Sequence, residues 1–162
     1  MLRNAALADQ AKIVTGLAPI TPSTSTPDFV SMKNFDRCAV IILVDNGATV
    51  TGSAITLLQS TVVAGTDEKA LAFSTMMANT DTAAADTLTA TAVASNTFTT
   101  SNTNNKNLMY VIDVKAEDLD RAGGFDCIRA GTANAVNAVV SVTYVLFPPR
   151  YASPAAVSAI TD

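Results

Sequence analysis

The sequence predicts an all-β fold, an antiparallel β-sandwich or jelly roll of about eight strands with an extended N-terminal arm. Apolar and β-branched segments recur at spacings of roughly ten residues, which is typical of sandwiches. Threonine alternates with leucine or alanine over residues 87–93, the period-two pattern of a strand. Charged residues make up only 15% of the chain, where about 25% is usual for a soluble domain.

The N-terminal arm is predicted over residues 1–28. Residues 1–18 are rich in alanine and leucine, which indicates a short helix, although their apolar positions form no clean stripe. The segment 19–28 reads PITPSTSTPD, and its three prolines exclude a regular helix or a central strand. We therefore expect an extended tether that reaches neighbouring protein chains. The predicted interface residues are Leu2, Leu7, Ile13, Leu17, Ile20 and Tyr151.

The β-sandwich domain is predicted over residues 29–151, followed by a C-terminal tail over 152–162. Its clearest strands are 38–45, 108–114, 125–131 and 138–147, with further strands at about 49–58, 69–77 and 87–93 and a short segment at Phe98. The polar segment 101–107 predicts an exposed loop, and 115–124 predicts a helical turn or a polar loop. Pro148 and Pro149 are expected to end the last strand, because proline donates no hydrogen bond to a sheet.

Two local features give more detailed expectations. Asn46-Gly47 follows the strand 38–45 and predicts a two-residue type I′ turn, in which both central residues have positive φ. In the strand 69–77, Leu71, Phe73 and Met77 are expected to share one face, because side chains alternate along a strand.

The composition argues against an enzyme. The chain contains no histidine, which removes Ser-His-Asp and Cys-His nucleophile systems and every His-ligated metal site. No serine lies in a G-x-S-x-G motif. Gly123-Gly124 precedes a predicted strand, so it indicates a turn and not a phosphate-binding loop. We expect no catalytic residues, no cofactor and no metal.

An acidic segment is the one place where chemistry could be sought. Its carboxylates fall within fourteen residues and are Asp113, Glu117, Asp118, Asp120 and Asp126. A calcium site needs several oxygen ligands from one loop, and the spacing of Asp118 and Asp120 could supply two. The segment lacks the order and the glycine of an EF-hand loop, so a solvated, turn-capping acidic loop is the favoured interpretation.

The charge distribution limits the partners. The net charge is −4 and the ten basic residues are scattered singly, which disfavours nucleic acid and anionic membrane surfaces. The longest wholly apolar run, residues 38–44, is far shorter than a membrane span. The low charge fits either a threonine-rich strand surface or a surface covered by neighbouring subunits. Cys38 and Cys127 are expected to be buried thiols, with a disulfide as the alternative.

Three segments carry a resemblance to a known class of protein. They are DFVSMKNFDRCAVIILVDNGATVTGSAITLLQS (28–60), NLMYVIDVKAEDLDRAGGFDCIRAG (107–131) and VVSVTYVLFPPRY (139–151). In this order they resemble small virion structural proteins of tailed bacteriophages, of the head decoration or minor capsid type. The resemblance implies a β-sandwich or jelly roll that binds the capsid surface, frequently as a dimer or trimer, with no catalytic residues.

These observations together predict a non-enzymatic virion protein, most directly a capsid decoration (cement) subunit. Its expected partners are the major capsid protein and other copies of itself, as a homodimer or homotrimer. Its expected location is the virion, after synthesis in the host bacterial cytoplasm. The alternatives are a head–tail connector or tail component, and a module that binds glycans or a host surface. Deletion of residues 1–28 is expected to leave a folded sandwich.

Overall fold

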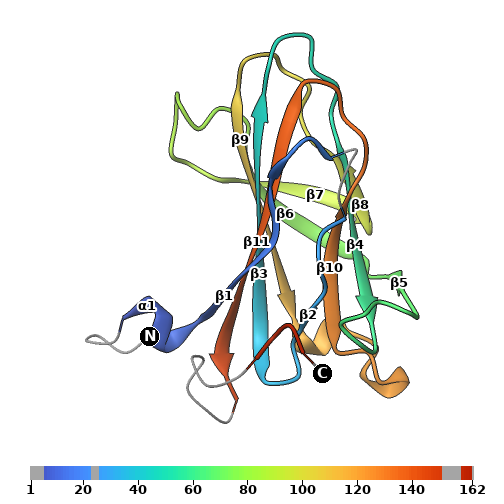
Figure 1. The fold of residues 1–162 in the computed structure, drawn as a ribbon. Coiled ribbons are helices and arrows are strands. Elements are labelled where there is room, and N and C mark those ends of the chain that lie inside the picture. The colour runs from blue at the N-terminus through green and yellow to red at the C-terminus, as the bar shows by residue number, and fades with distance from the viewer. Residues whose placement is uncertain (1–5, 23–25, 151–157, 162) are drawn as a thin grey trace.

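The computed structural model describes residues 6–22, 26–150 and 158–161. Over these residues the chain forms eleven strands in two antiparallel sheets that enclose one hydrophobic core (Figure 1). The predicted all-β sandwich is therefore confirmed. The helical elements are the short α1 (Leu7–Gln10) and the 3₁₀ turns η2 (Ala116–Asp118) and η3 (Arg121–Gly123).

In the described part of the chain, one sheet has six strands and the other has five. The six-stranded sheet has the order β1 (Lys12–Ile20), β11 (Ala138–Pro149), β3 (Phe35–Asn46), β9 (Asn107–Lys115), β6 (Phe73–Asn79) and β7 (Thr89–Ser95). The five-stranded sheet contains β2 (Val30–Ser31), β10 (Cys127–Thr132), β4 (Ala54–Ser60) and β5 (Lys69–Ala70), with β8 (Thr97–Thr99) also paired to β4.

The core forms because apolar side chains alternate along the three central strands of the six-stranded sheet. Their inward residues are almost completely buried and include Val40, Ile42, Leu108, Tyr110, Ile112, Val140, Val142 and Tyr144. The five-stranded sheet contributes Val30, Ile55, Leu57, Ile128 and Ala130 to the same core. Burial of this apolar surface is the main favourable term for folding.

Tyr144 of β11 connects both sheets and the edge strand β1. Its side chain is fully buried, and its hydroxyl accepts a hydrogen bond from the backbone N–H of Ala130 at 3.0 Å. The same hydroxyl donates to the carbonyl of Asp28 at 3.1 Å. The ring lies against Gly16, where a Cβ atom would come within 2.2 Å of it. Burial raises the pKa of the Tyr144 hydroxyl, so it stays protonated and able to donate.

The N-terminal segment differs from the predicted arm. The helix is only four residues long, and residues 12–20 form β1, which pairs with β11 of the same chain. The β-branched run Ile13-Val14-Thr15 favours an extended conformation. Gly16 leaves room for the Tyr144 ring, and Leu17 enters the core with 5% of its surface exposed. Much of the predicted arm is therefore an edge strand of the sandwich.

The predicted turn at Asn46-Gly47 is wrong. The preceding strand β3 and the following strand β4 lie in different sheets, and residues 47–53 cross from one sheet to the other. Gly47 does not have a positive φ, whereas Thr49 does, at 58°. The N–H of Gly47 donates to the carbonyl of Asn137 at 2.8 Å, so this segment is held by the β10–β11 connection.

The predicted strand 69–77 is divided between the two sheets. Residues 69–70 pair with β4, and residues 73–79 pair with β9 and β7. Leu71 and Met76 are buried, while Met77 is 37% exposed. The shared face predicted for Leu71, Phe73 and Met77 is therefore wrong, because the chain changes sheets between residues 70 and 73 and β6 has a register shift between Phe73 and Thr75.

The two cysteines are buried thiols, as predicted. Cys38 and Cys127 both have 0% exposed surface, and they lie on different sheets. Burial raises the pKa of the Cys38 thiol far above its usual value, which keeps it in the neutral form. Its place in the core indicates a packing role.

The substitution Tyr144→Phe tests the connection between the sheets. It removes the hydroxyl and leaves a buried N–H and a buried carbonyl without that partner, which costs about 1–3 kcal/mol. Urea unfolding followed by circular dichroism should show this loss with an unchanged m-value. Thr143→Val, one position along on the outer side of the strand, is the control and should change the stability by less than about 0.5 kcal/mol. Equal stability of Tyr144→Phe and wild type would contradict the assigned role.

Truncation tests the revised N-terminus. Deletion of residues 1–28 removes β1 and Leu17 and uncovers the Tyr144 ring, so the free energy of unfolding should fall by about 3 kcal/mol or more. This outcome reverses the expectation from sequence. Deletion of residues 1–10 leaves β1 intact and serves as the control in the same urea titration. A longer truncation as stable as the shorter one would show that β1 is dispensable.

Candidate interaction surface

The face of the six-stranded sheet that points away from the core carries many apolar side chains. We call this the outer face, and its apolar residues include Ile13, Ala39, Ile41, Leu43, Met77, Met109, Val111, Val139, Val145 and Phe147. Ile13 is 50% exposed, Leu43 44% and Met77 37%. A solvated sheet face usually carries polar residues at these alternating positions, so the apolar outer face indicates a contact surface.

The strand register brings these residues into rows across the sheet. Val111 of β9 lies opposite Ile41 on one side and opposite Met77 on the other. Leu43 lies opposite Met109 in the neighbouring row. Opposed side chains on one face of an antiparallel pair are in contact range, so β3, β9 and β6 present a continuous apolar band.

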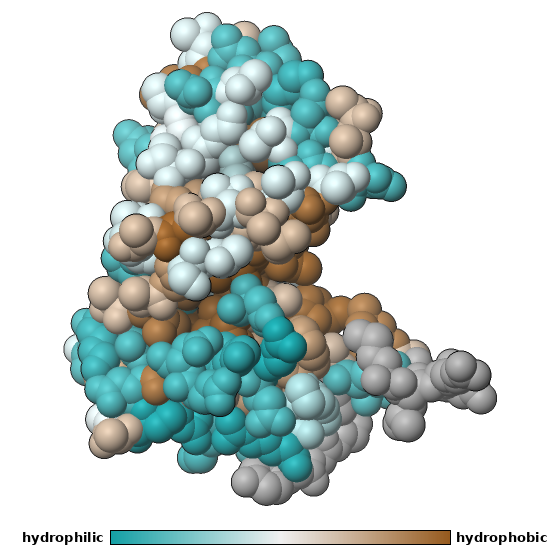
Figure 2. Space-filling view, turned by 180° about the vertical axis from the view of Figure 1, so that it is seen from behind, coloured by the Kyte–Doolittle hydropathy of each residue, from teal (hydrophilic) through white to brown (hydrophobic). Residues whose placement is uncertain are grey.

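A second row extends the band to the edge of the sheet. Val145 of β11 lies opposite Ala39 on β3 and opposite Ile13 on β1. Figure 2 shows hydrophobic residues gathered in a hollow of the surface, with hydrophilic residues below them. The outer face therefore combines an apolar floor with a polar border, as protein interfaces do.

A groove continues the outer face where β6 separates from β9. The two strands pair only at Met77, Ala78 and Asn79 of β6, so the remainder of β6 diverges. The resulting groove has a volume of about 810 Å³. Its apolar lining includes Leu71, Phe73, Met76, Val93 and Val111, and its polar lining includes Asp113, Lys115 and Asp118.

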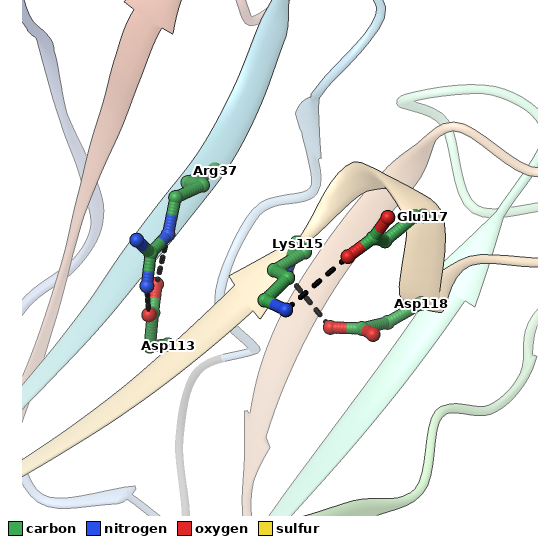
Figure 3. Close-up of polar contacts among 5 residues, drawn as sticks. All are labelled: Arg37, Asp113, Lys115, Glu117 and Asp118. Atoms are coloured by element: carbon green, nitrogen blue, oxygen red, sulfur yellow. Dashed lines mark hydrogen bonds and ion pairs between the residues drawn. The ribbon is translucent and has the colours of Figure 1, made fainter.

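Ion pairs border the outer face at one end (Figure 3). The guanidinium of Arg37 on β3 binds the carboxylate of Asp113 on β9 through two hydrogen bonds. The Lys115 ammonium lies 3.2 Å from Glu117 Oε1, and the Lys115 backbone N–H donates to Asp118 at 2.9 Å. These charges are paired within the chain, so this end is polar without a strong local net charge.

The acidic segment caps turns, as predicted. Asp120 Oδ1 accepts a hydrogen bond from the Gly123 backbone N–H at 3.0 Å, and Oδ2 pairs with Lys69. Two hydrogen bonds lower the pKa of Asp120 below its ordinary value of 3.8. The bond from Lys69 has the larger effect, and the bond from the Gly123 backbone has the next largest. Within the described residues, no group of three or more acidic or cysteine side chains is arranged to hold a metal ion.

The predicted interface residues fall into three groups. Leu7 is 52% exposed and Ile13 is 50% exposed, and Ile13 belongs to the outer face. Leu17 lies in the core and Ile20 is half-buried and packs against it, so the prediction for Leu17 is wrong. Leu2 and Tyr151 lie outside the described residues.

The sequence interpretation missed most of the outer face. The run CAVIILVD (38–45) predicts a buried strand, and because it lacks polar alternation its pattern does not show that one side faces outward. The structure buries only one side of it: Val40 and Ile42 face the core, whereas Leu43 faces outward. In a sandwich the chain itself covers only the inner face of each sheet. An uninterrupted apolar strand therefore places apolar side chains on the outer face as well, and this was the sequence signal for a contact surface.

Comparisons with known proteins give little further information. No protein-family model matches the chain, and neither does any curated protein. A solved structure with some similarity is the crystal structure of the SPBc2 prophage-derived protein YomS, at 14% sequence identity and a TM-score of 0.46. The alignment covers 84% of this chain and 92% of YomS. Similarity at this level carries no argument about function.

No helix within the described ranges has both the length and the hydrophobicity needed to cross a lipid bilayer.

Asp120 gives a pH-dependent test of the acidic turn. Because its pKa is lowered in the folded state, the stability it contributes is present above the ordinary value of 3.8 and is lost as the pH falls below it. The variant Asp120→Asn should therefore lose less stability than wild type between neutral and acidic pH. Thermal unfolding across a pH series measures this difference, with Glu117→Gln as the control. Parallel pH curves for wild type and Asp120→Asn would contradict the assignment.

Proposed function

We propose that this chain is a non-enzymatic structural protein of a bacteriophage particle, most directly a decoration subunit that binds the head shell through its outer face. The observation that carries the proposal is the apolar band across β3, β9 and β6, with Val145 of β11 and Ile13 of β1 beside it in the row of Ala39. The resemblance of residues 28–151 to small virion proteins supports the choice of partner.

The chemistry of the outer face suits a protein partner. Aliphatic and methionine side chains dominate its centre, and such groups gain free energy when they are removed from water against another apolar surface. The band is broad and continuous over several strands, whereas a small-molecule site needs a concave pocket with convergent polar groups. The paired charges of Arg37–Asp113 and Lys115–Glu117 form the rim.

The low charge of the whole chain fits the same function. Charged side chains are depleted in the buried centres of interfaces, and only 15% of this sequence is charged. A subunit that adds to a lattice contacts neighbours over a large share of its surface. The apolar outer face and the uncharged, exposed strand β7 support this proposal, because both could be covered by neighbours.

The substitution Leu43→Glu tests the proposal. It places a charge at the centre of the apolar band, so the number of copies on purified particles should fall by about tenfold or more, equivalent to about 1.4 kcal/mol of binding free energy. Quantitative mass spectrometry of gradient-purified particles, made in host cells that express each variant, measures the occupancy. Val136→Glu is a matched control, because Val136 is 52% exposed and lies on the β10–β11 connection, away from the outer face.

Other outcomes would redirect the assignment. Absence of the wild-type chain from purified particles would reject a virion function. Presence of the chain at the head–tail junction or in the tail, and not on the head shell, would favour a connector or tail component. Full occupancy of Leu43→Glu particles would show that another surface binds the shell.

A further inference from the structure

We infer that two copies of this chain associate through the free edge of β7, so that their six-stranded sheets become one continuous antiparallel sheet. β7 pairs with β6 along one edge. Along its other edge, no strand of the described residues forms a ladder with it. Figure 1 shows β6 and β7 crossing behind the other strands as the outermost pair of the sheet.

The free edge of β7 carries neither a charge nor a proline, and its one register shift against β6 lies near its C-terminal end, between Ala92 and Ser95. An edge strand presents a row of backbone N–H and carbonyl groups, and soluble proteins block such rows with charges, proline, bulges or short strands. Residues 87–105 contain no charged residue, no proline and no glycine. Six of the seven residues of β7 are exposed, so its side chains leave the edge accessible.

The opposite edge of the same sheet is blocked. β1 contains Lys12, Gly16 and Pro19, and its pairing with β11 has two register shifts. Proline cannot donate to an added strand, and irregular pairing distorts the edge. β1 therefore carries a charge, a proline and two register shifts, whereas β7 carries no charge, no proline and one register shift, so β7 is the more open edge of this sheet.

The side-chain pattern of β7 fits a second copy of itself. Ala90 and Ala92 lie on one side of the strand, and Thr89 and Thr91 lie on the other. Two copies of β7 can pair antiparallel about a two-fold axis. Residues on the same side of the sheet then lie opposite one another, even-numbered residues opposite even-numbered and odd-numbered opposite odd-numbered. In these registers alanine faces alanine and threonine faces threonine or Val93, which gives close contact with no buried charge.

Electrostatics favours this edge as the place where two copies meet. Each chain has a net charge of −4, so two copies repel one another over most approaches. The stretch 87–105 is uncharged, so two copies that meet along it bring no like charges of this stretch together. The pairing also aligns the outer faces of both copies, because Ala90 lies opposite Met77 within each sheet.

The experiment measures the mass of the purified full chain by sedimentation velocity over a concentration series. We expect wild type to reach twice the monomer mass. Ala92→Lys should raise the dimer dissociation constant by about tenfold or more, because it places a charge on the shared edge. Ala18→Lys, an exposed alanine on the blocked strand β1, is the matched control and should not change the dissociation constant.

A mixture of variants identifies the contact directly. Ala92→Lys and Ala92→Glu should each be monomeric alone, because two like charges meet at position 92 of the two copies. A mixture of the two variants should form a mixed dimer, because the lysine of one copy then lies opposite or diagonal to the glutamate of the other near the two-fold axis. A wild-type chain that stays monomeric at all concentrations overturns the inference. Dimers that survive Ala92→Lys but are lost in Leu43→Glu would assign self-association to the outer face and also overturn it. The result is independent of particle occupancy, so this inference and the proposed function can fail separately.

Discussion

The Tyr144 side chain is the constraint on which the arrangement of the sandwich depends. Its hydroxyl satisfies a backbone N–H of β10 and a carbonyl next to β2, while its ring requires glycine at position 16 of β1. A hydroxyl buried at the centre of a core is costly unless both of its hydrogen bonds are made. Tyr144 therefore constrains three features at once: the distance between the sheets, the position of β1 and the register of β11.

In this arrangement the two faces of the six-stranded sheet differ in function. The inward side chains of β3, β9 and β11 supply the core that holds the sheets together. Because that core is complete, the apolar residues of the outer face, such as Leu43 and Val111, are not needed for packing within the chain. Contact with another protein is the explanation that we propose for their presence. The neutral edge of β7 is the second contact that we infer, and it lies in the plane of the sheet, whereas the outer face points out of that plane.

The strands that form the core were predictable from sequence, and their connections were not. Residues 38–45, 108–114 and 138–147 are rich in apolar and β-branched residues, a pattern that predicts strands. The change of sheet after Asn46 depends on contacts with Asn137 far along the chain, so local turn preferences gave the wrong hairpin. The outer face was missed because an apolar strand has the same pattern whether its second side is covered by its own chain or by a partner. The turn-capping carboxylates were predictable, since the residues they cap lie within three positions.

Cryo-electron microscopy of the parent particle tests the central claim most directly, because it shows which surface of the chain the particle covers. The account predicts density for this sandwich on the head shell, with Ile41, Leu43 and Val111 buried against the capsid protein. Absence of the chain from the shell, or a bound chain whose outer face points to solvent, would contradict it.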